Sequence, residues 1–224
     1  MSYAIAIDGP AGAGKSSIAK CLAERLNIIY VDTGALYRVI GLAVYREAGH
    51  CTDPDTISRI AQSVRVSLSH NESGQRVFLG DEDVSEEIRR EEISQMASIV
   101  SAVPSVREKL LSLQRDMARS QSVVMDGRDI GTRILPDAQY KIFLICPAEE
   151  RARRRMEQLK EQGMTGDYDQ ILADIKERDH RDMTREISPL KKADDAIEFD
   201  TNGLTAEQSA GLIIEVLNLC PTSC

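Results

Sequence analysis

A short glycine-rich stretch near the N-terminus has the composition and spacing of a phosphate-binding loop. Residues 9–17 read GPAGAGKSS and contain the full GxxxxGK[ST] pattern. Gly9 and Gly14 permit backbone conformations that let successive N–H groups point at phosphate oxygens, at the N-terminus of the following helix. Lys15 can reach the terminal phosphates of a nucleoside triphosphate, and the Ser16 hydroxyl can ligate a Mg²⁺ ion held between them. The pattern therefore predicts a site for a Mg²⁺-bound nucleoside triphosphate.

The whole phosphate loop is expected to contact this nucleotide. Its predicted contacts are Gly9, Pro10, Ala11, Gly12, Ala13, Gly14, Lys15, Ser16 and Ser17. Ser17 has two interpretations, because it could touch the α-phosphate or simply lie in the first helical turn. The chain carries neither an NKxD-type stretch, as expected of a GTPase, nor an LSGGQ-type signature, as expected of a transport ATPase. It is also short for a motor or a helicase, which leaves a small kinase with a second substrate.

Charged residues on one predicted helical stripe could bind that second substrate. At 100° per residue, Ile171, Ile175, Arg178, Asp182 and Arg185 fall within about 80° of one another. A solvated outer face would also carry such charges. However, the same stripe begins with isoleucines, so its continuation is expected to line a cleft. Guanidinium groups there could bind phosphate in bidentate fashion, with the carboxylate available for a sugar hydroxyl or for orienting an arginine.

Two further arginines support a second anion site. Arg38 follows DTGALY near the start of a predicted helix, and Arg128 follows a predicted strand in VVMDGRD. Ligand-binding residues of α/β proteins lie at such carboxyl ends of strands. Phosphoryl transfer between two phosphates needs charge cancellation and alignment but no general base, because the attacking phosphate oxygen is already anionic.

Short apolar strands alternating with helices must position these residues. The predicted strands are residues 3–8, 27–31, 122–125, 140–145 and 196–199, and the predicted helices include 15–26, 32–49, 83–100, 104–119 and 205–219. A period-two pattern at 64–69, turn residues at 71–74 and a return strand at 75–79 predict an inserted β-hairpin. The chain is thus expected to be α/β, with a five-stranded, mostly parallel sheet covered on both faces. No linker separates independent domains, so residues 1–224 are expected to form one domain.

Composition excludes several classes of protein. The 224 residues are 42% hydrophobic and carry a formal net charge of -8, which disfavours a general nucleic-acid binder. No apolar run reaches the roughly 18 residues of a membrane helix. Five cysteines without CxxC spacing, at positions 21, 51, 146, 220 and 224, are expected to be reduced thiols. We expect a soluble, cytoplasmic monomer without nucleic-acid or membrane partners.

Five stretches in this order resemble one known family. They are IDGPAGAGKSS, VDTGALYR, the insertion ending LGDEDVSEEIR, MDGRDIGT and IKERDHRDMTREISPL, and together they cover nearly the whole chain. The chain resembles the bacterial cytidylate kinases, within the P-loop nucleoside monophosphate kinases. The resemblance implies transfer of the γ-phosphoryl group of ATP to CMP or dCMP. It also implies a monophosphate-binding region at about 33–103, containing the insertion near 60–97, and a short lid at about 149–168.

The resemblance also implies roles for individual residues. Thr33, Tyr37, Arg38, Arg128 and Arg178 would meet the monophosphate, Asp182 the ribose and Arg185 the acceptor nucleotide, while Ser98, Arg107 and Asp129 would identify cytosine. Lys15, Arg128, Arg178 and Arg185 would be catalytic. Many relatives have serine where this chain has Thr33, and the hydroxyl is retained.

Three residues have open interpretations. Arg151 and Arg155 in the lid share a helical face, where they either reach ATP phosphates on closure or form a solvated basic surface. Asp126 either orders a magnesium-bound water or holds the GRD turn. The competing functions are a monophosphate kinase of broader range, acting on UMP and CMP or related to adenylate kinase, and a non-catalytic P-loop switch. The hairpin and DGRD disfavour the former, and the second arginine-rich site disfavours the latter.

Overall fold

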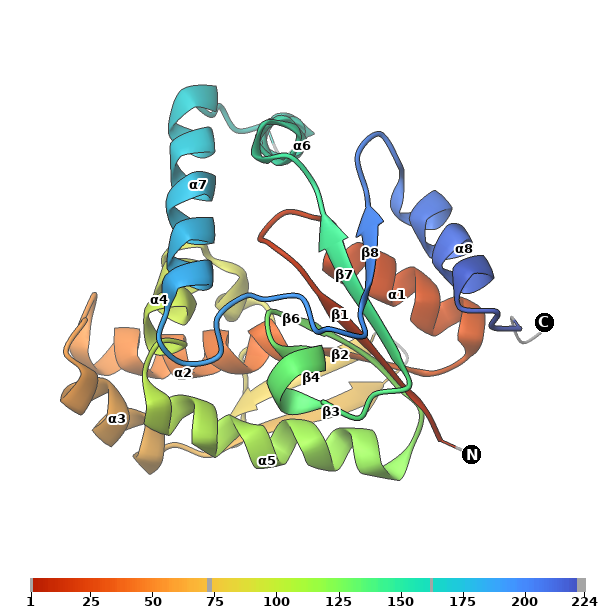
Figure 1. The fold of residues 1–224 in the computed structure, drawn as a ribbon. Coiled ribbons are helices and arrows are strands. Elements are labelled where there is room, and N and C mark those ends of the chain that lie inside the picture. The colour runs from red at the N-terminus through yellow and green to blue at the C-terminus, as the bar shows by residue number, and fades with distance from the viewer. Residues whose placement is uncertain (1, 72–73, 162, 221–224) are drawn as a thin grey trace. The chain divides into compact units, whose positions relative to one another are not determined.

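Two compact units make up the chain. The computed structural model describes residues 2–71, 74–161 and 163–220 (Figure 1). The first unit contains residues up to Ile29 together with residues from Gln121 onward, and the second unit is Tyr30–Ser120.

A five-stranded sheet carries the phosphate loop. Its strands are β1 (Ala4–Asp8), β2 (Ile29–Asp32), β6 (Val123–Gly127), β7 (Tyr140–Ile145) and β8 (Ile197–Asp200), in the order β2-β6-β1-β7-β8. Strand β1 pairs in parallel with β6 and β7, and β7 pairs in parallel with β8. Every residue of β1 is buried, which explains its apolar run AIAID. The predicted sheet is confirmed, with strand ends shifted by one or two residues.

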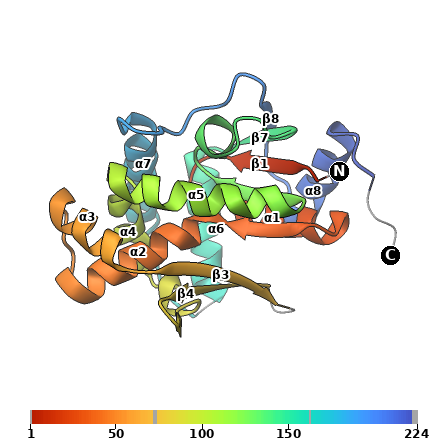
Figure 2. The ribbon, with the colours of Figure 1, turned by 90° about the horizontal axis from the view of Figure 1, so that it is seen from below.

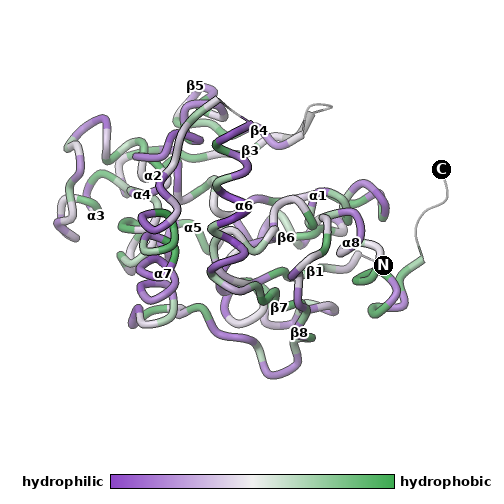
Figure 3. Tube along the Cα trace, turned by 90° about the horizontal axis from the view of Figure 1, so that it is seen from above, coloured by the Kyte–Doolittle hydropathy of each residue, from purple (hydrophilic) through white to green (hydrophobic). Residues whose placement is uncertain are grey.

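Helices of the first unit follow the sequence pattern closely. They are α1 (Lys15–Leu26), α6 (Ala148–Glu161), α7 (Tyr168–Thr184) and α8 (Ala206–Val216), with a π-helical turn η2 (Ile130–Ile134) after β6. Helices α1 and α8 lie side by side (Figure 1). Thr205 and Gln208 form a capping box that begins α8. Helix α6 is hydrophilic along most of its length (Figure 3). Among the described residues, no helix is both long and apolar enough to cross a bilayer.

A small antiparallel sheet and five helical segments make up most of the second unit. Its helices are α2 (Thr33–Ala48), α3 (Pro54–Ser63), the 3₁₀ turn η1 (Glu87–Arg89), α4 (Glu91–Val100) and α5 (Pro104–Ser120). The strands β3 (Val66–Asn71), β4 (Gly74–Leu79) and β5 (Glu82–Asp83) pair in the order β3-β4-β5. Strands β3 and β4 lie antiparallel beside one another (Figure 2), so the predicted hairpin is confirmed and has a third short strand.

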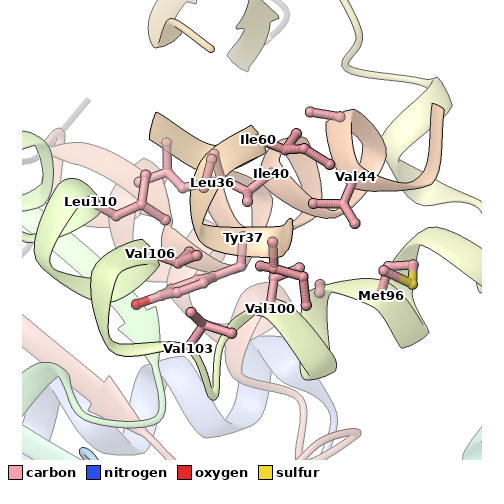
Figure 4. Packing of buried hydrophobic residues seen from close by; sticks show 14 residues of the cluster. Leu36, Tyr37, Ile40, Val44, Ile60, Met96, Val100, Val103, Val106 and Leu110 are labelled. Carbon is pink, nitrogen blue, oxygen red and sulfur yellow. The ribbon is translucent and has the colours of Figure 1, made fainter. Parts of the chain in front are cut away.

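One apolar cluster joins the helices of the second unit (Figure 4). Its members include Leu36, Ile40 and Val44 of α2, Ile60 of α3, Met96 and Val100 of α4, and Val106 and Leu110 of α5. Complete burial of such a side chain stabilises the fold by roughly 1.5–3 kcal/mol. The cluster therefore fixes the helix that begins at Thr33.

The segment 83–100 was expected to be one helix; α4 confirms this for Glu91–Val100, and the prediction is wrong for residues 83–90. Asp83 lies in β5, where its carboxylate accepts hydrogen bonds from the Ser85 N–H at 3.0 Å and from Arg76 Nε at 2.9 Å. The Ser85 hydroxyl in turn accepts from the Val77 N–H at 2.9 Å. These bonds to β4 keep the chain out of an α-helix until Glu91. The structure also contains α3, which was not predicted although Asp53 caps it and Pro54 is its first residue.

The described cysteines, at positions 21, 51, 146 and 220, are all free thiols. Cys224 lies outside the described residues.

Candidate active site

The phosphate loop joins β1 to α1 in a conformation that requires glycine. Gly9 has φ +153°, and a Cβ atom there would lie 2.6 Å from the Leu144 carbonyl oxygen on β7. Gly14 has φ +85° and caps α1, which begins at Lys15. A side chain at either position would be strained. The loop therefore presents its backbone at the positive end of a helix, as the sequence pattern predicts.

Lys15 is buried within a group of charged side chains. It is 6% exposed, and its Nζ donates to the Pro10 carbonyl oxygen at 2.7 Å. Burial lowers the pKa of Lys15 well below its usual value, and the Arg128 charge lowers it further, while Asp126 and Asp182 oppose the shift. An anion bound at the loop would relieve this repulsion between cations.

Asp126 lies beside the loop at the end of β6. The Ser16 hydroxyl donates to Asp126 Oδ2 at 2.9 Å, and the carboxylate is buried. Hydroxyl and carboxylate oxygens are the ligand types that Mg²⁺ takes in proteins. The contact therefore joins Asp126 to the loop residue that the sequence pattern predicts as a Mg²⁺ ligand.

Two side chains far along the chain hold the loop from behind. Arg151 Nη1 donates to the Ala11 carbonyl oxygen at 2.9 Å, and Thr201 Oγ1 donates to the Ala13 carbonyl oxygen at 3.2 Å. Both carbonyls are thereby directed into the protein. Within the loop, the Ala13 N–H donates to the Pro10 carbonyl oxygen at 3.4 Å.

Arg151 is a buried side chain with several hydrogen-bond partners. It is 5% exposed, pairs with Asp179 of α7 through Nη2 at 2.6 Å, and donates from Nε to the Cys146 carbonyl oxygen at 2.9 Å. Its neighbour Arg154 also lies beside the loop, because Arg154 Nη1 is 3.9 Å from the place a Cβ would take on Gly14. Arg154 also donates from Nη2 to the Thr201 carbonyl oxygen at 2.6 Å. The sequence pattern selected Arg151 and Arg155 and did not single out Arg154.

Asp8 connects β1 to the DGRD segment. Its two carboxylate oxygens accept from the N–H groups of Ile130 and Gly131, each at 2.8 Å. Burial raises the pKa of Asp8 to about 6, although these two hydrogen bonds favour the charged form. Asp8 therefore fixes the start of the π-helical turn that follows Arg128 and Asp129.

The predicted stripe on α7 joins the same segment. Arg128 Nε donates to Asp182 Oδ2 at 2.7 Å, and Arg185 Nη1 lies 3.9 Å from Asp182 Oδ1. Burial disfavours the charge on Asp182, but the Arg128 charge and hydrogen bond, with Arg185 and Arg178, hold the pKa of Asp182 below its usual value. Helix α7 ends at Thr184, one residue before Arg185, the last residue of the predicted stripe. The Arg185 side chain is nevertheless largely buried, and its Nη2 lies 4.0 Å from Asp129 Oδ1.

In the second unit, the predicted residues gather at the N-terminus of α2. Asp32 caps this helix by accepting from the Ala35 N–H at 3.0 Å, and its other oxygen accepts from Arg38 Nη2 at 2.6 Å. Thr33, the first residue of the helix, is 2% exposed.

Tyr37 of α2 contacts Arg107 of α5, which in turn is linked to the end of α4. The Arg107 guanidinium lies 5.4 Å from the Tyr37 ring centroid. Arg107 Nη1 donates to the Ser101 carbonyl oxygen at 3.1 Å, and the Ser101 hydroxyl donates to the Ser98 carbonyl oxygen at 2.9 Å. Ser98 and Arg107 are the two residues of this unit that are predicted to recognise cytosine, and Ser101 connects them by hydrogen bonds.

The structure thus groups the predicted residues in two sets, one in each unit. The first unit brings together Lys15, Arg128, Asp129, Arg178, Asp182 and Arg185, and the second contains Thr33, Tyr37, Arg38, Ser98 and Arg107. The residues that sequence reasoning missed are Asp8, Asp32, Arg154 and Thr201. Asp8 and Asp32 each end a strand, which is a usable signal. Nothing in the local sequence marks Thr201.

Comparisons with known proteins identify the family of this chain. The family model described as cytidylate kinase matches residues 5–219. A cytidylate kinase of Mycolicibacterium paratuberculosis is 50% identical over 205 residues, covering 91% of this chain and 90% of the relative. One from Caldanaerobacter subterraneus subsp. tengcongensis is 50% identical over 217 residues, covering 97% and 95%. A crystal structure of an uncharacterized protein from Eubacterium ventriosum shares the fold, with a TM-score of 0.54 and 17% identity over 97% of this chain and 99% of that one.

Proposed function

Because the chain belongs to the cytidylate kinase family, we propose that it transfers the γ-phosphoryl group of ATP to CMP or dCMP, giving ADP and CDP or dCDP. The observation that carries this proposal is the burial of Lys15 among Arg128 and Arg178 beside the phosphate loop. A loop built only to grip one triphosphate would not need arginines from two other elements. Their presence fits a reaction in which negative charge from two nucleotides has to be neutralised at one place.

On the donor side, ATP is bound by residues 9–17. The loop N–H groups hold the phosphates, and Lys15 contacts the oxygens nearest the transferred group. Ser16 and Asp126 would hold Mg²⁺, directly or through water, because their oxygens already share one hydrogen bond. Bound there, Mg²⁺ would neutralise phosphate charge. Of the lid arginines, Arg154 is the best supported as an ATP-binding residue, since it lies beside Gly14. Arg151 instead supports the loop by donating to the Ala11 carbonyl oxygen. Arg155 stays a candidate from the lid at 149–168.

On the acceptor side, the proposed contacts follow the roles that the family resemblance implies. Thr33, Tyr37, Arg38, Arg128 and Arg178 bind the monophosphate, Asp182 binds the ribose, and Arg185 lies against the acceptor. In the structure Asp182 also orients Arg128. Asp129, Ser98 and Arg107 select cytosine. A carboxylate accepts from the cytosine amino group, whereas uracil presents a carbonyl there and leaves two acceptors facing each other.

The reaction needs alignment more than proton transfer. The attacking CMP phosphate oxygen is already anionic, so no residue has to remove a proton before attack. Lys15, Arg128, Arg178 and Arg185 cancel charge on the attacking and transferred groups. Ion pairs of Arg128 and Arg185 with Asp182, and of Arg185 with Asp129, hold these two guanidinium groups in place before substrates bind. We further propose that the protein is a monomer and acts in the cytoplasm, where ATP and CMP are available.

An ADP-release assay with ATP and each common nucleoside monophosphate tests the proposal. We expect turnover with CMP and dCMP and much less with UMP, AMP or GMP. The variant Lys15→Ala should lose nearly all transfer while still binding CMP by calorimetry, and Lys20→Ala, an exposed lysine on the same helix, serves as its control. Preference for AMP or GMP, or ADP release that does not depend on an acceptor, would defeat the proposal.

A further inference from the structure

The inserted sheet packs along α2 through an apolar surface. Val39 and Leu42 of α2 are buried against Val77 of β4 and against Val84 and Ile88 after it. Partly buried side chains of β3 and β4, Val66, Leu68 and Leu79, extend the same cluster. The insertion therefore supports one whole face of the helix that begins with Thr33.

An ion-pair network fixes the far end of α2 to the same insertion. Arg46, in the last turn of α2, donates to Glu82 of β5 at 2.7 and 2.8 Å, and it also pairs with Glu87 of η1. These contacts are partly exposed, so each contributes little to stability by itself. Their geometric consequence is that the C-terminal turn of α2 and the insertion are held in register.

Gln75 makes the corresponding contact at the near end of α2. Its side-chain Oε1 accepts from the Asp32 N–H at 2.9 Å, and its Nε2 donates to the Asp32 carbonyl oxygen at 3.3 Å. One amide of β4 thus satisfies both backbone polar groups of the residue that caps α2. A backbone held by two bonds from one planar group has little freedom to rotate.

Asp32 in turn fixes the side chain of Arg38. The Asp32 carboxylate accepts from the Ala35 N–H and from Arg38 Nη2, so backbone and guanidinium share one support. The Arg38 side chain folds back over the first turn, where its Nη1 lies 3.1 Å from the place a Cβ would take on Gly34. The buried Arg38 Nε has no hydrogen-bond partner among the described residues. An oxyanion would satisfy that donor.

We propose that Gln75 is a positioning residue for the acceptor phosphate: the insertion uses its amide to fix Asp32, and through Asp32 the Arg38 guanidinium and the first turn of α2. The proposal rests on the proposed function, because it takes the anion at Arg38 to be the phosphate of CMP. It gives the insertion a defined part in acceptor binding in addition to its packing.

Two substitutions of Gln75 separate hydrogen bonding from packing. Gln75→Met keeps the length and volume of the side chain but removes both hydrogen bonds, and Gln75→Ala removes the side chain. Because each lost hydrogen bond is worth about a factor of ten or less, we expect both variants to raise KM for CMP about tenfold, with KM for ATP changed less than twofold. The matched control is Gln62→Ala, since the Gln62 amide also donates to a backbone carbonyl of this unit, that of Ser105 at 3.4 Å.

Hydrogen exchange gives a readout that does not depend on activity. The Asp32 N–H should exchange faster in Gln75→Met than in the wild type, while the amides at the far end of α2 keep their rates. If KM for CMP stays within twofold, if KM for ATP rises equally, or if Gln75→Met behaves as wild type and only Gln75→Ala is impaired, the positioning role is wrong. If the wild type does not use CMP as a substrate, the proposed function is wrong. If the exchange rate of the Asp32 N–H is the same in Gln75→Met and in the wild type, only the proposed role of the Gln75 hydrogen bonds is wrong.

Discussion

The Ser16 hydroxyl and the Asp126 carboxylate are joined by a 2.9 Å hydrogen bond between the first turn of α1 and the end of β6. The sequence separates these residues by 110 positions, and the parallel pairing of β1 with β6 brings them together. One oxygen pair thereby connects the phosphate loop to the strand that leads into Arg128. The same pair has the oxygen chemistry that Mg²⁺ takes in proteins, so we expect Mg²⁺ binding and the position of Arg128 to depend on the same strand end.

Replacing Asp126 by Asn should therefore weaken metal-dependent turnover. The amide keeps the size of the side chain but removes its charge, and we expect kcat/KM for ATP to fall about 10- to 100-fold, as for other groups that support a metal. The fall should be largest at low Mg²⁺ concentration. Titration of Mg²⁺ in the ADP-release assay checks this, with Asp137→Asn, an exposed residue of the same unit, as control. Equal Mg²⁺ dependence in both variants would show that Asp126 only holds the turn.

Replacing Arg178 by Lys should impair catalysis more than stability. Lysine keeps the charge but cannot make two parallel bonds to a phosphate. Loss of one such preorganised contact typically lowers turnover by about 10²-fold. Steady-state kinetics with CMP and thermal unfolding should be measured on the same preparation. If melting becomes broad and early while the remaining folded protein turns over normally, Arg178 is a structural residue.

Local patterns predicted the elements whose signals lie within a few residues. The loop 9–17 and the helix 15–26 need only glycine spacing and an apolar period, and both are confirmed. The prediction of a helix over 83–100 is wrong for residues 83–90, because the signal that decides their structure lies outside the segment. Its acidic residues suit a helix, but Asp83 and Ser85 bind Arg76 and Val77 of β4, and no local pattern contains that pairing. Tertiary contacts outweigh helix propensity here.

The site shows the same division. Arg128, Arg178 and Asp182 were found because a strand end and a helical stripe mark them, and the structure groups them as expected. Arg151 shows where this reasoning ends. From the sequence it is a basic residue on a charged helix, yet Asp179, 28 positions away, makes it a buried support for the loop. Gln75 is similar, because only the fold places a hairpin glutamine against Asp32.

The buried Asp8 should make stability depend on pH. Its pKa in the folded protein is raised to about 6 from the usual 3.8, so the folded state holds the proton more tightly than the unfolded state. Stability from this group is therefore fully present below about pH 4 and is lost as the pH rises to about 6, by roughly 3 kcal/mol in total. Asp8→Asn cannot titrate. The free energy of unfolding of the wild type relative to this variant should fall between pH 4 and pH 7, and urea unfolding at several pH values measures it. A difference that is constant, or that grows with pH, would contradict the raised pKa.

The ion pair between Arg151 and Asp179 gives the most direct test of how the loop is supported. Asp179→Ala leaves the Arg151 charge buried without its carboxylate, and breaking such a pair typically costs about 3–5 kcal/mol. Because Arg151 also donates to the Ala11 carbonyl, we expect KM for ATP to rise with the loss of stability while KM for CMP changes little. Lys176→Ala is a matched control, since its exposed pair with Glu149 joins the same two helices and should contribute about 0–1 kcal/mol. Denaturant unfolding and initial rates report the two effects separately, and Asp179→Asn, which keeps one acceptor, should lie between them. If Asp179→Ala costs no more stability than Lys176→Ala, or if KM for CMP rises as much as KM for ATP, then this pair does not support the phosphate loop.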